Sequence, residues 1–183
     1  ASGSLWIVNY HGQPSFENPP LPLWALALAF KLFGVSDYSV ALPAALFGVA
    51  TVLLTYRFAE RLFNDRWTAF LAGAILILPG FFVDYARRGM VDVPLTFFVA
   101  AALFCFMNAD KNPRWYLLFG LFTALAVLTK SALGFFPLLI GFTYSILARP
   151  SSPLADRGFY FWVGVIIAPV LGSSWYLVNI FQL

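Results

Sequence analysis

Residues 115–148 read WYLLFGLFTALAVLTKSALGFFPLLIGFTYSILA, two solid apolar runs with Lys130 between them as the only charged side chain. Each run approaches the ~20 residues that a helix needs to cross ~30 Å of hydrocarbon. Because the runs are continuously apolar and do not alternate, they favour helices over the strands of a membrane barrel. The shorter run, Trp115–Thr129, has Arg114 and Lys130 at its ends, where long basic side chains extend to the membrane surface. This stretch therefore predicts two membrane-spanning helices.

The same pattern extends over most of the chain. Further stretches without a charged residue are Tyr38–Tyr56, Trp67–Val83, Val93–Ala109 and Phe159–Leu183. The composition is 61% hydrophobic and 10% charged, whereas a soluble domain carries roughly 25% charged residues. We therefore expect an all-α, polytopic membrane helical bundle with about six transmembrane helices. The net charge of +3 is small and scattered, which argues against a nucleic-acid partner.

The charges in the connections between these runs predict an orientation. Seven of the 11 basic residues fall in three connections on one side of the membrane: Arg57, Arg61, Arg66, Lys111, Arg114, Arg149 and Arg157. By the positive-inside rule this side is cytoplasmic. The opposite ends of the runs then face the periplasm or lumen, and they carry Asp84, Arg87, Arg88, Asp92 and Lys130.

The stretch Pro20–Phe33 is apolar but short, because 14 helical residues rise only ~21 Å. We expect it to lie along the outer surface as an interfacial helix, opened by Asn18 as the cap and by Pro19-Pro20. Residues 1–37 are then part of the first external loop, and residues 38–183 form the transmembrane bundle. This arrangement puts Glu17 on the outer face; if the stretch crossed the membrane, Glu17 would be cytoplasmic.

Several motifs resemble a known family. The segments Ser2-Gly3-x-x-Trp6-Ile7-Val8, Gly12-x-Pro14-x-Phe16-Glu17-x-Pro19-Pro20-Leu21-x-x-Trp24 and Phe33-Gly34-Val35 are similar to the first external loop of the polyprenyl-phosphate-dependent glycosyltransferases. That branch of the GT-C superfamily contains the protein O-mannosyltransferases and the aminoarabinose transferases of lipid A. Its later outer-edge motifs resemble Arg88-x-x-x-Asp92-x-Pro94-Leu95-Thr96-Phe97-Phe98 and Leu128-Thr129-Lys130-x-x-x-Gly134. The resemblance covers essentially the whole chain.

The resemblance implies an activity. The partners would be a polyprenyl-phosphate-linked sugar donor, membrane lipids, and a lipid, glycan or protein acceptor that attacks the anomeric carbon while the lipid phosphate leaves. The protein would lie in a bacterial inner membrane with its active face periplasmic or extracellular. In this family the leading catalytic Asp stands at the start of the first external loop, a position that would precede Ala1. We therefore expect this chain to be a fragment that lacks the first transmembrane helix, the main base and the C-terminal portion.

For three candidate residues the family resemblance implies a functional role, and each also has a simpler structural interpretation. Glu17 matches an acidic residue that helps to bind a divalent metal ion in some members, or it is a solvated loop carboxylate. Asn18 stands where the family often has a lysine that touches the donor phosphate, and its residue type favours a helix cap. Asp92 matches the family's second acidic residue and is our candidate catalytic group, or it caps the helix that contains Pro94.

The candidate cations also have two interpretations each. Lys130, between two apolar runs with no acid within a helical turn, would contact the donor phosphate or extend to the membrane surface. Arg87 and Arg88 would bind phosphate as bidentate donors, or pair with Asp84 at the surface. His11 is the only histidine, and a single histidine is poor support for a metal site.

Two other classes of protein compete with the transferase. A membrane transporter or lipid scrambler would use the same outer-face charges, but transporters often contain paired repeats, and no repeat at a fixed period is visible here. Prolines interrupt several of the runs, at Pro43, Pro79, Pro137 and Pro169. A purely structural membrane subunit would not require Glu17, Asp92 and Lys130 on one side.

Overall fold

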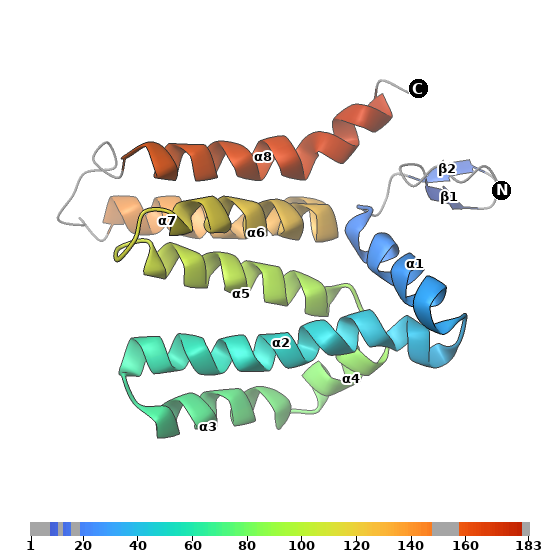
Figure 1. Cartoon of the computed structure of the whole chain (residues 1–183), viewed down its shortest axis with the longest axis horizontal. Coiled ribbons are helices and arrows are strands. Elements are labelled where there is room, and N and C mark those ends of the chain that lie inside the picture. The colour runs from blue at the N-terminus through green and yellow to red at the C-terminus, as the bar shows by residue number, and fades with distance from the viewer. Residues whose placement is uncertain (1–7, 11–12, 16–18, 148–157, 181–183) are drawn as a thin grey trace. The chain divides into compact units, whose positions relative to one another are not determined.

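The computed structural model describes residues 8–10, 13–15, 19–147 and 158–180. Helices dominate these residues, as the solid apolar runs predict (Figure 1). The helices are α1 (Leu21–Phe33), α2 (Asp37–Phe63), α3 (Arg66–Ile77), α4 (Phe81–Arg87), α5 (Asp92–Asn108), α6 (Trp115–Lys130), the 3-10 helix η1 (Ser131–Phe135), α7 (Phe136–Leu147) and α8 (Gly158–Ile180). The chain folds into two compact units, one of residues Pro22–Ala100 and one of Ala1–Leu21 with Ala101–Leu183.

A short β-hairpin, which the sequence analysis did not predict, lies in the N-terminal segment. Strands β1 (Val8–Tyr10) and β2 (Gln13–Ser15) pair antiparallel, with Val8 opposite Ser15. The expected all-α fold is therefore observed in the described residues from Leu21 onward, whereas residues 8–10 and 13–15 before them form two strands. Three-residue strands offer too short a pattern to detect from sequence, because alternation needs at least four to eight residues to be recognised.

Apolar helices long enough to cross a membrane make the chain an integral membrane protein. Among the described residues, Asp37–Phe63, Trp115–Leu147 and Gly158–Leu177 meet the length and composition of a span. Helices α3 and α4 taken together are also long and apolar enough to form a fourth span, but the angle between them is 64°. The bend follows Pro79 and is completed by Gly80, whose φ of 71° favours glycine. The run Trp67–Val83, expected to be one helix, is therefore broken.

Helix α1 starts later than the sequence analysis predicted. It begins at Leu21, so the proline in its first turn is Pro22 and the position before the helix is held by Pro20. Asn18 lies outside the described residues, so its role as the cap stays a prediction. Proline is tolerated in the first helical turn because the backbone N–H groups there have no partner within the helix.

The unit of residues Pro22–Ala100 packs through small residues. A Cβ atom added to Gly48 of α2 would lie 3.2 Å from the Cβ of Ala86 in α4, so the two helices approach closely. Close approach at small residues is the usual way in which membrane helices gain packing energy. The Thr51 and Thr55 hydroxyls donate to carbonyls of their own helix at 2.7 and 2.8 Å, which satisfies these groups away from water.

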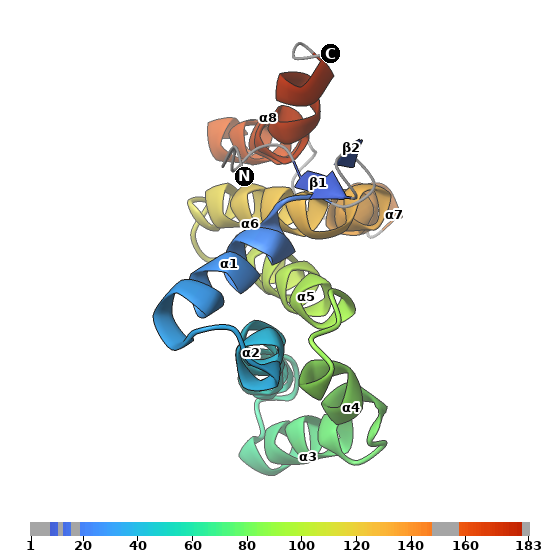
Figure 2. The same ribbon diagram turned by 90° about the vertical axis from the view of Figure 1, so that its right-hand side faces the viewer.

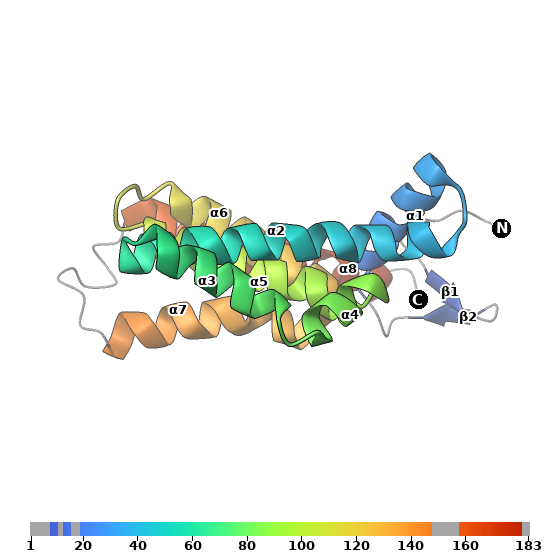
Figure 3. The ribbon, with the colours of Figure 1, turned by 90° about the horizontal axis from the view of Figure 1, so that it is seen from below.

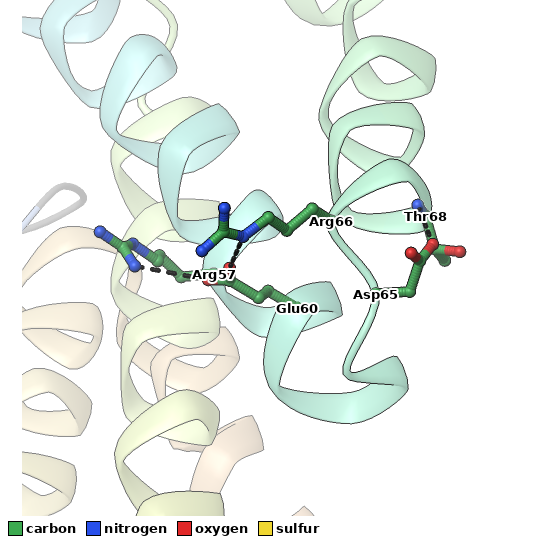
Figure 4. A network of polar contacts seen from close by, with 5 residues as sticks. All are labelled: Arg57, Glu60, Asp65, Arg66 and Thr68. Carbon is green, nitrogen blue, oxygen red and sulfur yellow. Dashed lines mark hydrogen bonds and ion pairs between the residues drawn. The ribbon is translucent and has the colours of Figure 1, made fainter.

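The turn between α2 and α3 carries the charges that the orientation argument assigns to the cytoplasm (Figure 4). Glu60 lies 3.4 Å from Arg57 and 3.9 Å from Arg66. Asp65 caps α3 by accepting a hydrogen bond from the Thr68 backbone N–H at 2.7 Å. Hydrogen bonding to Thr68 holds the pKa of the Asp65 carboxyl below its usual value.

In the other unit, the continuous helical run from α6 to α7 folds back on itself at η1. A Cβ atom on Gly134 would lie 2.2 Å from the Val127 nitrogen, so η1 lies flat against the last turns of α6. Further along α7, a Cβ on Gly141 would lie 3.4 Å from the ring of Phe119, earlier in α6. Helices α6 and α7 are thus antiparallel arms, and Figure 3 shows α7 in orange as a helix of its own.

Helices α6 and α8 run parallel and in close contact (Figures 1 and 2). A Cβ on Gly120 would lie 2.2 Å from the Gly164 carbonyl oxygen, so only glycine permits this backbone separation. The Tyr116 and Phe161 rings lie 5.1 Å apart in an edge-on contact. Around these contacts lies an aromatic core in which Cys105 is buried beside Phe119.

Candidate functional site

The connection between α4 and α5 holds three of the predicted site residues. Arg87 ends α4, Arg88 follows it, and Asp92 begins α5. Gly89 lies between them with a φ of 70°, and a Cβ atom there would lie 2.9 Å from the Val40 carbonyl oxygen of α2. The connection therefore rests directly on the first turn of α2, which fixes where the charged residues stand.

Arg88 forms an ion pair with Asp84. Its Nε lies 3.0 Å from one carboxylate oxygen of Asp84 and 3.1 Å from the other. This is the surface pairing that the sequence analysis left open. The Arg88 side chain is 65% exposed and that of Asp84 47%, so water screens the pair and its contribution to stability is small. The guanidinium group has five N–H donors, and the contact with Asp84 is made by Nε.

Asp92 is the first residue of α5 and is partly buried. The next three residues are buried, so α5 is anchored immediately after the carboxylate. A carboxylate in the first turn also lies near the positive end of the helix dipole. The Asp92 backbone carbonyl accepts a hydrogen bond from the Thr96 hydroxyl at 2.8 Å. Asp92 thus has a structural role at the helix start, which is compatible with its predicted chemical role.

Lys130 is the last residue of α6, in the unit of residues Ala101–Leu183. The backbone leaves the helical conformation at this residue, with φ −155° and ψ 79°. Its neighbour Thr129 is 2% exposed, whereas Lys130 is only half-buried. An ammonium group in this position ends an apolar helix, as the sequence predicted.

Two residues beside Lys130 were missed by the sequence analysis. The Ser131 hydroxyl is hydrogen-bonded to the Tyr176 hydroxyl of α8. Ser131 is adjacent to Lys130 and could have been noticed, but Tyr176 is 45 residues away and no local pattern indicates the contact.

The predicted metal and first-loop residues fall outside the described part of the chain. Glu17, Asn18 and His11 all lie in the ranges that are not described. Within residues 8–10, 13–15, 19–147 and 158–180, no group of three or more His, Cys, Asp and Glu side chains comes together as a metal site would require.

An apolar groove of about 430 Å³ lies between α1 and α2. It is lined by Ala25, Leu28, Ala29, Leu32, Phe33, Leu42, Pro43, Leu46, Phe47, Ala50 and Phe97. These side chains offer almost no polar group, so the groove suits a hydrocarbon chain.

Comparison with known proteins identifies the family of the chain. Residues 17–176 match the family described as dolichyl-phosphate-mannose-protein mannosyltransferase. An uncharacterized protein of Aquifex aeolicus is 32% identical over 96% of this chain and 35% of its own length. An undecaprenyl phosphate-alpha-4-amino-4-deoxy-L-arabinose arabinosyl transferase of Sodalis glossinidius is 30% identical over 73% of this chain and 25% of its own length.

Solved structures show the same fold. The crystal structure of ArnT from Cupriavidus metallidurans in the apo state superimposes with a TM-score of 0.80 and 27% identity, over 98% of this chain and 34% of that protein. The ArnT structure bound to undecaprenyl phosphate gives the same TM-score, at 26% identity. The chain therefore spans about a third of the length of the relatives that it matches. It belongs to the dolichyl-phosphate-mannose-protein mannosyltransferase family.

Proposed function

We propose that the protein is a membrane glycosyltransferase that moves a sugar from a polyprenyl-phosphate donor to a lipid, glycan or protein acceptor. The observation that carries this proposal is the likeness over 98% of the chain to ArnT, a protein whose structure has been determined with undecaprenyl phosphate bound. The arabinosyl transferase of Sodalis glossinidius supports the same class of donor. The apolar groove along α1 and α2 supports it further, because a polyprenyl tail needs such a surface.

The proposed topology has six crossings, formed by α2, by α3 with α4, and by α5, α6, α7 and α8. Helix α1 lies along the outer surface, within an external loop of residues 1–37, and residues 38–183 form the bundle. The reversal at η1 supports the count, since it divides one long apolar run into two arms. The basic turn between α2 and α3 supports a cytoplasmic side opposite the active face. The active face is then periplasmic or extracellular, in a bacterial inner membrane.

The reaction sets the roles of the candidate residues. An acceptor oxygen attacks the anomeric carbon, the bond from that carbon to the phosphate oxygen breaks, and the lipid phosphate leaves with the bonding electrons. Asp92, the match to the family's second acidic residue, would assist the main base in taking the proton of the acceptor. Lys130, Arg87 and Arg88 would contact the donor phosphate, where cations stabilise the developing negative charge. Asn18 would contact it through its neutral amide. Glu17 would contribute to a divalent metal site, on its match to the family motif alone.

Turnover of a lipid-linked sugar tests the proposal. The full-length protein that contains this chain is purified and incubated with sugars linked to undecaprenyl phosphate and with lipid, glycan or protein acceptors, and release of the free lipid phosphate is measured. Wild-type protein should release it, and Asp92→Asn should reduce the turnover number by about 100-fold or more, the usual contribution of a general base. Lys111→Ala, on the cytoplasmic side, is the matched control and should retain full turnover. Movement of labelled lipids between leaflets without sugar release would favour a scrambler and overturn the proposal.

A further inference from the structure

The point where the chain leaves α6 is held by contacts from two directions. On one side, η1 packs against α6 at Gly134, where a Cβ atom would lie 2.2 Å from the nitrogen and 2.3 Å from the Cα of Val127. On the other side, a Cβ on Gly172 of α8 would lie 2.8 Å from the Cβ of Val127. Val127 is 1% exposed between them. Helix α6 is therefore closely packed on both sides at Val127, one turn before Lys130.

Tyr176 extends this packing with a polar contact. It lies one helical turn after Gly172, so the two residues share the face of α8 that packs on α6. Its hydroxyl is hydrogen-bonded to that of Ser131. The adjacent Trp175 is completely buried, with its ring centroid 4.9 Å from that of Tyr176. The tyrosine hydroxyl thus extends from a part of α8 that is anchored by a buried tryptophan.

The register between the two helices makes this contact the end of a continuous series. Tyr116 contacts Phe161, Gly120 contacts Gly164, Val127 contacts Gly172, and Ser131 contacts Tyr176. Partners in each pair are 44 or 45 positions apart, as expected for parallel helices in a fixed register. The hydrogen bond between the Tyr176 and Ser131 hydroxyls therefore holds the residue directly after Lys130.

We infer that Tyr176 is a positioning residue for Lys130, and that its hydrogen bond to Ser131 fixes the backbone from which the ammonium group is presented to the donor phosphate. The inference rests on the proposed contact between Lys130 and that phosphate. A lysine has four rotatable bonds, so its reach is set by where its Cα is held and in which direction its Cβ points. Loss of the hydrogen bond lets the turn at Lys130 relax while the packing at Val127 keeps α6 and α8 together.

Removal of single hydroxyl groups tests the inference in the full-length protein. Tyr176→Phe should raise the KM for an undecaprenyl-phosphate-linked sugar about threefold to tenfold, the effect of one net hydrogen bond, with little change in kcat. Ser131→Ala should have the same effect, and the double variant should be no worse than either single one. Ser131→Thr keeps the hydroxyl and should restore the wild-type KM. Tyr144→Phe removes a hydroxyl from the exposed face of α7 and should leave KM unchanged.

Repeating the Tyr176→Phe substitution in Lys130→Ala protein shows whether Tyr176 acts through Lys130 or has only a general structural role. In Lys130→Ala protein, Tyr176→Phe should have no further effect on KM, because the tyrosine acts only through the lysine. A further rise of KM there, or an unchanged KM when Tyr176→Phe is made in the wild type, would overturn the inference. If Lys130→Ala itself leaves KM unchanged, the proposed phosphate contact fails first. If wild-type protein releases no sugar from any such donor, the proposed function fails instead.

Discussion

Lys130 ends a helix that is otherwise uncharged, and a charged group at membrane depth is expensive unless an anion meets it. We expect Lys130→Ala to weaken binding of a polyprenyl phosphate analogue by about tenfold or more, equivalent to about 1.4 kcal/mol. Lys130→Arg should be only partly tolerated, because a planar fork replaces a point charge. Titration of the analogue against the three proteins measures this. Unchanged affinity in Lys130→Ala would move the phosphate site to Arg87 and Arg88.

The ion pair between Arg88 and Asp84 gives a second test at the scale of single residues. Because the pair is exposed, Asp84→Asn should change the free energy of unfolding by less than about 1 kcal/mol. If Arg88 contacts the donor phosphate, removal of its competing carboxylate should tighten binding of the analogue. Arg88→Gln should weaken binding instead. If Asp84→Asn and Arg88→Gln bind the analogue with equal affinity, Arg88 does not contact the phosphate and only pairs with Asp84 at the surface.

At the scale of elements, the connection from α4 to α5 depends on glycine. Gly89→Ala should destabilise the protein by more than the ~1–2 kcal/mol expected for a left-handed backbone, because its Cβ would also lie 2.9 Å from the Val40 carbonyl. It should lower activity as well, since Arg88 and Asp92 flank this position. Gly80→Ala is the matched control: its φ is 71° and nothing lies within 4 Å of the added Cβ.

Thermal unfolding in detergent, with turnover measured in parallel, compares the two glycine variants. Gly89→Ala should show the lower unfolding temperature and the larger loss of turnover. Equal effects of both substitutions would mean that the contact with Val40 does not hold the connection in place.

The cap of α3 predicts a dependence of stability on pH. Hydrogen bonds to Thr68 lower the pKa of folded Asp65, so its charge stabilises the folded state above the unfolded pKa of 3.8. That contribution is lost as the pH falls through the still lower folded pKa. The unfolding temperature of wild type should therefore exceed that of Asp65→Asn at neutral pH, with the difference narrowing below about pH 4. Asp37→Asn, at the exposed start of α2, is the control. If the difference in unfolding temperature between wild type and Asp65→Asn does not change with pH, the charge of Asp65 does not stabilise the start of α3.

At the scale of the whole molecule, the proposed topology puts the loops on defined sides. In a background without Cys105, cysteines at Ser15, Met90 and Leu133 should react with an impermeant thiol reagent from outside. A cysteine at Asn112 should react only after the membrane is permeabilised. Labelling of position 15 only after permeabilisation would make α1 a membrane span and remove the proposed outer location of Glu17.

The sequence by itself determined the class of molecule and most of the candidate residues. Apolar runs and loop charges are local properties, so they predicted helices, orientation and the place of Lys130 at a helix end. The motifs indicated the family, and the match of residues 17–176 to the family confirms it. Element ends were predicted less well. Helix α1 begins at Leu21, and the run Trp67–Val83, in which the sequence analysis noted Pro79 but expected one helix, is bent at Pro79-Gly80. The hairpin of Val8–Tyr10 with Gln13–Ser15 was not predicted.

Only the tertiary structure decided which residues support the predicted ones. The contact of Ser131 with Tyr176 and that of Gly120 with Gly164 join positions 44 or 45 residues apart. Each contact depends on the separation and register of two helices, and these are set by packing along their full length. The sequence analysis treated α8 as one apolar run, whereas in the structure its small residues Gly164, Ala168 and Gly172 are buried and its large residues Ile166, Val170 and Leu177 are exposed. The packing of α8 on α6 brings the Tyr176 hydroxyl to Ser131, the residue after Lys130.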